Sequence, residues 1–191
     1  MTELLRKIFG TLLNSIAGFF ISIGFSADTI TILGVLGNFL AAWFIAQGNL
    51  LTGGFLVLGF GLFDAIDGSM ARLRGSETKF GAFLDSVLDR YSELAIFFGI
   101  LVYSIRTYDP VNCSLVFLAA AGSVLVSYIR ARAQSLGIDT KIGILTRVER
   151  YLVIVPSLLF GRPDIGLWIV AVLAHITAFQ RILHVRQQLK Q

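Results

Sequence analysis

Long apolar runs alternate with short polar connections along most of the chain, and this pattern predicts a bundle of helices. Residues 29–46 form an almost unbroken apolar run, which at about 1.5 Å per residue is long enough to cross a bilayer. The six predicted spans cover residues 28–46, 50–73, 80–105, 111–135, 146–161 and 164–184. Their short connections leave no room for a separate soluble domain, so residues 1–191 are predicted to form a single membrane domain.

The first twenty residues follow a different pattern, that of an amphipathic helix. Apolar residues recur at helical spacing between Leu4 and Ile16, while Glu3, Arg6 and Lys7 occupy the opposite side. Such a segment is typical of a helix that lies in the membrane interface, and we place it at residues 2–20. The alternative is that it begins a first span. It lacks a small-residue cleavage site, so we do not expect a removable signal peptide.

Composition agrees with a membrane location. Hydrophobic residues make up 55% of the 191 residues and charged residues 15%, and the mean hydropathy of +0.78 is far above that of a typical soluble domain. Cys113 is the single cysteine, which excludes an intramolecular disulfide framework. The predicted fold class is an all-α integral membrane protein, with six transmembrane helices preceded by an amphipathic interfacial helix at the N-terminus.

The basic residues indicate on which side of the membrane each connection lies. With six spans and both termini inside, all of the 16 lysines and arginines fall in cytoplasmic segments except Arg106 and Arg162. Lysine and arginine are enriched in cytoplasmic loops, and a missed or added span would scramble this asymmetry. We therefore predict a protein of the cytoplasmic membrane with both termini and the functional site on the cytoplasmic side. This distribution explains the net charge of +4, so no nucleic acid partner is expected.

Four aspartates gather in the cytoplasmic halves of the second and third spans. The residues on one face of the second span are Asp64, Asp67, Gly68, Ala71 and Arg72, and those on one face of the third are Gly81, Asp85 and Asp89. Counted from Ser76 in the polar connection, the two pairs of aspartates lie at matching heights, about 13 and 19 Å along their helices. Because the connection is short, we predict an antiparallel helix pair with a pocket between the carboxylates.

Four carboxylates in a membrane-embedded pocket need cations. An ionised aspartate at a helix centre costs about 2.5–3.5 kcal/mol on insertion scales, and Arg72 cannot neutralise four of them. An all-oxygen site favours Mg²⁺, Mn²⁺ or Ca²⁺, and two such ions about 3.5–4 Å apart would suit displacement at phosphorus. One alternative is a structural network in which the aspartates pair with Arg72, Arg74 and Arg90.

A cation transporter is the alternative from a different class of protein, because intramembrane carboxylates can line an ion path. The acidic residues, however, occupy only the predicted cytoplasmic halves of the two spans. The outer half of the third span, residues 94–104, has no ionisable side chain except Tyr103. A path that stops halfway favours a pocket over a pore.

The aspartate-bearing segment fills every fixed position of the motif D-x2-D-G-x2-A-R-x8-G-x3-D-x3-D, from Asp64 to Asp89. In this motif, in length and in the six-span layout, the chain resembles the CDP-alcohol phosphatidyltransferases. The resemblance implies that a phosphatidyl group passes from CDP-diacylglycerol, a membrane lipid, to a hydroxyl acceptor while CMP leaves. It also implies a homodimer.

The resemblance further implies roles for individual residues. One divalent cation would be held by Asp64, Asp67 and Asp85 and a second by Asp64, Asp85 and Asp89, with Mg²⁺ as the expected ion and Mn²⁺ as the alternative. Asp89 would also be the general base that takes the acceptor proton. The expected contacts with the CDP-lipid are Gly68, Ala71, Arg72, Thr78 and Gly81, and the backbone at Thr29, Ile30, Thr31 and Ile32.

Basic residues near the predicted cytoplasmic face indicate an anionic acceptor. The candidates for binding its phosphate are Ser127, Arg130, Arg147, Arg150 and Arg181. For each arginine alone, the positive-inside rule is an equally good explanation. The segment S-Y-x-R-A-R-A at 127–133 resembles that of prokaryotic phosphatidylinositol-phosphate synthases, whose acceptor is inositol 1-phosphate, although lysine is usual where Arg130 stands. We therefore favour inositol 1-phosphate, with glycerol 3-phosphate as the alternative acceptor and an archaeal ether lipid as the alternative donor.

Overall fold

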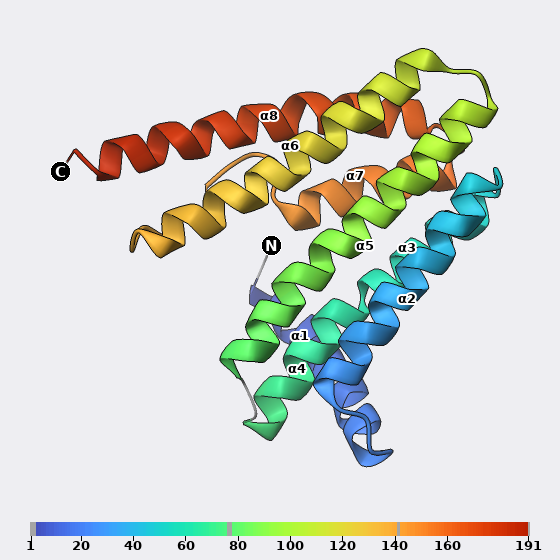
Figure 1. The fold of residues 1–191 in the computed structure, drawn as a ribbon. Coiled ribbons are helices and arrows are strands. Elements are labelled where there is room, and N and C mark those ends of the chain that lie inside the picture. The colour runs from blue at the N-terminus through green and yellow to red at the C-terminus, as the bar shows by residue number, and fades with distance from the viewer. Residues whose placement is uncertain (1–2, 76–77, 141, 191) are drawn as a thin grey trace.

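The computed structural model describes residues 3–75, 78–140 and 142–190, and all regular structure within these ranges is helical (Figure 1). The helices are α1 (Glu3–Ser22), α2 (Ala27–Ala46), α3 (Leu50–Gly61), α4 (Phe63–Arg74), α5 (Lys79–Arg106), α6 (Pro110–Ser135), α7 (Arg147–Leu159) and α8 (Pro163–Gln188). The predicted all-α class is confirmed. The predicted second span corresponds to α3 and α4, which meet at Leu62.

Four helical segments of the described ranges are long and apolar enough to cross a membrane. They are Ala27–Ala46, Leu50–Arg74, Pro110–Ser135 and Pro163–Gln188. At 28 residues α5 has the necessary length, but its first half carries the charged side chains of the motif. With 13 residues α7 rises about 20 Å, less than the roughly 30 Å hydrocarbon core of a bilayer.

The surface of the bundle is apolar where a soluble protein would be polar. Large side chains such as Phe98 on α5, Phe117 on α6 and Leu152 on α7 are 63%, 72% and 68% exposed. Apolar patches of this kind mark a surface that lies against lipid rather than water. Together with the four span-length helices, they make the chain an integral membrane protein.

The helices that carry the motif are assembled around α2. In Figure 1 α2, α3, α4 and α5 run in a similar oblique direction, while α6 and α8 lie side by side above them. α2 packs against both α4 and α5, but α4 and α5 scarcely pack against each other. The predicted antiparallel pair therefore does not pack closely along its length, and the two helices face each other across their converging carboxylates. Ser76, the predicted centre of the turn, lies outside the described residues.

Glycines allow α2 to approach its neighbours closely. A Cβ atom at Gly99 of α5 would lie 2.5 Å from the carbonyl oxygen of Ala42, and one at Gly37 of α2 would overlap the ring of Phe60. The glycines at 34, 53, 54 and 61 also contact side chains of the same chain, whereas a Cβ at Gly59 would meet nothing within 4 Å. These glycines, apart from Gly59, therefore serve packing within one subunit.

Local caps define where α2 and α5 begin and where α4 ends. Ser26 Oγ accepts the N–H of Thr29 at 3.1 Å, and Thr78 Oγ1 accepts the N–H of Gly81 at 2.9 Å. Gly75 ends α4 in the left-handed conformation, with φ of 60°. The apolar side of α4 packs against α1 and α2 in a small core of Ala17, Ile30, Ile66 and Met70. The polar side of α4 is thereby turned toward α5.

Candidate active site

Three carboxylates from α4 and α5 converge in the structure. One oxygen each of Asp64, Asp67 and Asp85 lies within 4.8 Å of the other two. Asp67 is only 6% exposed, and Asp64 and Asp85 are half-buried. Clustered carboxylate oxygens are the ligands that hard divalent cations prefer. Three of the four aspartates predicted to bind metal are thus brought together.

Thr31 of α2 fixes one of these carboxylates. Its Oγ1 lies 2.5 Å from Asp67 Oδ2, to which it donates, and 3.1 Å from the carbonyl oxygen of Ala27. Thr31 was expected to contact the CDP-lipid, and the structure places its hydroxyl against the acidic cluster. A hydrogen bond of this kind orients a carboxylate that would otherwise rotate.

The fourth aspartate, Asp89, is engaged by arginines. Arg147 Nη2 lies 2.5 Å from Asp89 Oδ1, and Arg147 Nη1 donates to Asp64 Oδ2 at 2.6 Å, so one guanidinium joins α4 and α5. Arg90 Nη2 lies 3.3 Å from Asp89 Oδ2. The Arg147 guanidinium also lies over the ring of Tyr151, 5.7 Å from its centroid. Asp89 therefore stands apart from the three-carboxylate cluster, although one side chain links the two.

The two other arginines of the alternative network have different partners. Arg72 Nη2 donates to Ser69 Oγ at 2.9 Å, and Arg74 Nη2 donates to the carbonyl oxygen of Ile21 at 3.4 Å. Within the described residues neither makes an ion pair with an aspartate of the motif. The predicted network of Arg72, Arg74 and Arg90 is thus wrong for the first two and holds for Arg90.

A cavity of about 270 Å³ opens between these groups. It is lined by Thr31, Gly34, Val35, Asn38, Phe60, Gly61, Asp64, Asp67, Leu88, Asp89, Ser92 and Arg147. Two polar members were not predicted from the sequence: Asn38 and Ser92, both 3% exposed. Asn38 interrupts an apolar run and Ser92 follows Asp89 by three residues, so a search for polar residues inside spans would have found them. The cavity connects the acidic cluster with Asp89.

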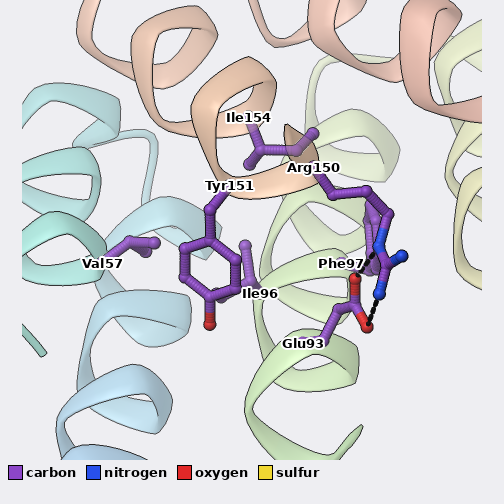
Figure 2. A pocket seen from close by; sticks show the side chains of 7 residues that line it. All are labelled: Val57, Glu93, Ile96, Phe97, Arg150, Tyr151 and Ile154. Carbon is purple, nitrogen blue, oxygen red and sulfur yellow. Dashed lines mark hydrogen bonds and ion pairs between the residues drawn. The ribbon is translucent and has the colours of Figure 1, made fainter. Parts of the chain in front are cut away.

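Arg150 lies in a second cavity of similar volume and has a structural partner (Figure 2). Its Nε and Nη2 donate to the two oxygens of Glu93 at 2.6 and 3.1 Å, and its Nη1 donates to the carbonyl oxygen of Leu145 at 3.4 Å. The side chain of Arg150 is 2% exposed and that of Glu93 is 8% exposed. Because all three nitrogens are used within the protein, the prediction that Arg150 binds the acceptor does not fit its placement.

Of the remaining acceptor candidates, two donate hydrogen bonds to backbone carbonyl oxygens and one is exposed without such a partner among the described residues. Arg181 is buried, and its Nε and Nη1 donate to the carbonyl oxygens of Ile142 and Val126 at 2.9 and 2.7 Å. Ser127 Oγ donates to the carbonyl oxygen of Ser123 at 3.1 Å. Arg130 is exposed and has no hydrogen bond or ion pair within the described part of the chain. Arg130 and Arg150 lie within electrostatic range of Arg181.

The residues expected to contact the CDP-lipid surround the end where α2 and α5 begin. A Cβ atom at Gly81 would lie 3.0 Å from Thr78 Oγ1 and 3.9 Å from Asp28 Oδ1, so the two helix starts are adjacent. A Cβ at Gly68 would lie 3.4 Å from Arg72 Nη1. Further residues expected there are half-buried Ala71, exposed Thr29 and Ile32, and fully buried Ile30. The Ile30 side chain belongs to the small core and leaves only its backbone for a ligand.

Known proteins are similar to this chain in sequence and in fold. Residues 25–180 match the sequence profile of CDP-alcohol phosphatidyltransferase. The archaetidylinositol phosphate synthase of Pyrococcus horikoshii is 40% identical over 171 residues, covering 88% of each chain.

Solved structures of the Mycobacterium tuberculosis phosphatidylinositol phosphate synthase are also similar. The form with CDP-DAG bound is 32% identical, with a TM-score of 0.86 over 92% of this chain and 94% of that one. The form in complex with manganese and citrate is 32% identical, with a TM-score of 0.84 over 91% and 88% of the two chains. The chain therefore belongs to the CDP-alcohol phosphatidyltransferase family and is a membrane-embedded transferase.

Proposed function

We propose that the chain transfers a phosphatidyl group from CDP-diacylglycerol to the hydroxyl of inositol 1-phosphate, with release of CMP. The observation that carries this proposal is the convergence of Asp64, Asp67 and Asp85 within 4.8 Å, linked by Arg147 to Asp89. The similar proteins from Pyrococcus and Mycobacterium are both named for products that contain inositol phosphate, which supports this acceptor.

The acidic cluster fits a divalent cation. Asp85 Oδ1 is buried and has no hydrogen-bond partner among the described residues, so a hard oxygen ligand is available there. Asp64, Asp67 and Asp85 would hold one cation, and Asp64, Asp85 and Asp89 a second. Mg²⁺ is the proposed ion and Mn²⁺ the alternative, since a related structure contains manganese. When bound, the metal offsets negative charge on the diphosphate and on departing CMP.

The side chains of the protein position the substrates and move the proton. Asp89 lines the cavity and accepts the proton of the attacking hydroxyl while the new oxygen–phosphorus bond forms and the bond to CMP breaks. Gly68, Ala71, Arg72, Thr78 and Gly81, with the first turn of α2 at 29–32, contact the CDP portion. Their clustering around the adjacent starts of α2 and α5 supports this role.

The acceptor phosphate binds to Arg130 and Arg147, with Ser127 and Arg181 at the border of the site. The exposed, unbonded guanidinium of Arg130 supports this choice, as does the position of Arg147 in the cavity. Arg181 keeps the segment at Ile142 in place, and Arg150 supports the site through Glu93. The exposed guanidinium of Arg130, with the partly exposed guanidinium of Arg147 in the cavity, favours a phosphorylated acceptor over a neutral alcohol.

The membrane arrangement proposed for the chain has six crossings within one domain, with both termini and the site on the cytoplasmic side. The distribution of the 16 basic residues supports it. α1 would lie in the interface, since Ala17 and Phe20 pack toward α4 while Leu12 and Phe19 expose apolar surface. A homodimer is also proposed, on the resemblance to the family.

A turnover assay tests the acceptor. Purified protein with Mg²⁺ and CDP-diacylglycerol is offered inositol 1-phosphate, glycerol 3-phosphate, inositol or serine, and CMP release is measured. We expect inositol 1-phosphate to be used fastest, and Arg130→Gln to raise its KM by about tenfold through loss of one charged hydrogen-bonding partner. Arg132→Gln, which removes an exposed arginine of the same helix bonded to Ser135, is the matched control. Faster use of glycerol 3-phosphate would reject the acceptor, and no CMP with any acceptor would reject the reaction.

The second candidate differs in the donor. The Pyrococcus relative, at 40% identity, is named for an archaetidyl product, which favours a test of an ether-lipid CDP donor beside the diacyl donor. Both donors present the same CDP group to the site, so the assay compares their kcat/KM at a fixed inositol 1-phosphate concentration. A clear preference for the ether lipid would replace CDP-diacylglycerol in the proposal and leave the acceptor unchanged.

A further inference from the structure

We propose that Arg147 couples the binding of divalent cations to the binding of the anionic acceptor. Without a cation its guanidinium pairs with Asp64 and Asp89, and when a divalent cation takes these carboxylates, Arg147 turns to the acceptor phosphate. The cation and the acceptor therefore bind with positive cooperativity. This inference rests on the proposed function and adds a thermodynamic link between its two ligands.

The contacts of Arg147 are those of a cation in a site of carboxylates. Its two terminal nitrogens lie 2.6 Å from Asp64 Oδ2 and 2.5 Å from Asp89 Oδ1, and these residues belong to different helices. Asp64 is also a member of the acidic cluster, with an oxygen within 4.8 Å of Asp67 and Asp85. One carboxylate is thus shared between a resident positive charge and the proposed cation site.

The charges of the site make this sharing a competition. When all four aspartates are ionised they carry four negative charges, and Arg147 and Arg90 contribute two positive ones, which leaves enough charge for one divalent cation. A second cation needs the carboxylates that Arg147 now holds. Like charges a few ångströms apart in a partly buried cavity repel strongly, so the guanidinium and the cations disfavour each other there. This repulsion is relieved when the Arg147 side chain turns from the carboxylates to another anion.

The geometry of α7 allows a side-chain movement without a backbone movement. Arg147 is the first residue of the helix, and just before it the Leu145 N–H donates to Thr177 Oγ1 at 3.0 Å. Three residues later Arg150 is locked by Glu93. Between these two fixed points the long Arg147 side chain is 25% exposed. An acceptor phosphate in the cavity would offer it a partner that no longer competes with the metal.

Linkage gives the expected signature. If the acceptor draws Arg147 away from the carboxylates, the acceptor raises the affinity for the cation, and the cation raises the affinity for the acceptor by the same factor. A factor of about ten lies within the usual range for such coupling. Free inositol lacks the phosphate and should give no coupling.

The test is a Mn²⁺ titration followed by electron paramagnetic resonance, on the full chain in detergent and without CDP-lipid, so that no turnover occurs. We expect saturating inositol 1-phosphate to tighten Mn²⁺ binding about tenfold in the unaltered protein. Arg147→Gln should bind Mn²⁺ several-fold tighter in the absence of acceptor and lose most of the coupling at saturating acceptor. Arg147→Lys keeps one charge and should fall between the two. Arg162→Gln removes a guanidinium that pairs with Asp164 outside the site and should leave both constants unchanged.

The outcomes separate this inference from the proposed function. Absence of Mn²⁺ binding to the unaltered protein would count against the metal site itself. If the unaltered protein binds Mn²⁺ but inositol 1-phosphate does not change its affinity, the coupling is overturned and the proposed reaction stays in place. This outcome needs no variant. Weaker Mn²⁺ binding by both folded Arg147 variants would also overturn it, because a competing cation was removed or weakened.

Discussion

Arg147 and Arg150 lie one turn apart at the start of α7, yet they belong to two different regions of the molecule. Arg147 reaches the cavity and joins Asp64 to Asp89 through contacts of 2.6 and 2.5 Å. Arg150 points to the other cavity, where two of its nitrogens donate to Glu93 and both side chains are almost fully buried (Figure 2). Two arginines of one helix therefore have different roles: Arg147 belongs to the candidate site, and Arg150 stabilises the fold.

The difference is set by α5, which supplies a partner to each arginine. Asp89 and Glu93 are one helical turn apart on α5, and Arg147 and Arg150 are one turn apart on α7, so the two helices meet as two charged pairs in succession. The first pair lies beside a polar cavity and the second among apolar side chains such as Ile96 and Phe97. The arginine side chain is 25% exposed in the first pair and 2% exposed in the second, so only the first can exchange its partner for a ligand.

Breaking the buried pair should produce the largest effect. Arg150→Met leaves the Glu93 carboxylate buried without its partner, which costs about 3–5 kcal/mol of stability. Thermal unfolding in detergent measures the loss. The double variant Arg150→Met with Glu93→Leu removes both charges and should recover most of that stability, as apolar replacements of whole buried pairs commonly do. Equal instability of the single and double variants would contradict the structural role.

The carboxylates joined by Arg147 should respond in unequal ways. Asp89→Asn removes the proposed base and should lower turnover by about 10²–10⁴, while Mn²⁺ binding is kept better than in Asp64→Asn because Asp89 is proposed as a ligand of only one of the two cations. Asp64→Asn removes a shared ligand and should lower turnover and Mn²⁺ affinity together. Mn²⁺ titration beside CMP release measures both quantities. Equal loss of Mn²⁺ affinity in the two variants would remove the separate base role of Asp89.

The smallest effect is expected at Thr31, which contacts the cluster through Asp67, whereas Arg147 contacts it through Asp64. Thr31→Val keeps the shape but removes the hydroxyl that donates to Asp67 at 2.5 Å. Loss of such a supporting hydrogen bond commonly weakens metal binding by about 10–100-fold, and we expect the lower figure because Asp67 remains. Thr31→Ser restores the donor and is the control. An unchanged Mn²⁺ affinity in Thr31→Val would show that Asp67 needs no support from α2.

The sequence determined the class of the protein and the centre of its chemistry. Apolar periodicity identified the helical segments, because a membrane demands long apolar helices whatever their neighbours are. The spacing of Asp64, Asp67, Asp85 and Asp89 placed each pair on one helix face, since helical geometry alone decides which residues share a face. The converging carboxylates follow from that local geometry.

Only the tertiary structure decided what each arginine does. The sequence grouped Arg130, Arg147, Arg150 and Arg181 as one basic cluster, because charge and position near a helix end are all that it records. The structure binds Arg150 to Glu93 and Arg181 to two carbonyl oxygens, and it leaves Arg130 exposed. It also packs α2 against both α4 and α5, which scarcely pack against each other. These outcomes depend on which helices cross and how deeply they bury each side chain, and contacts between segments distant in the chain have no local signature.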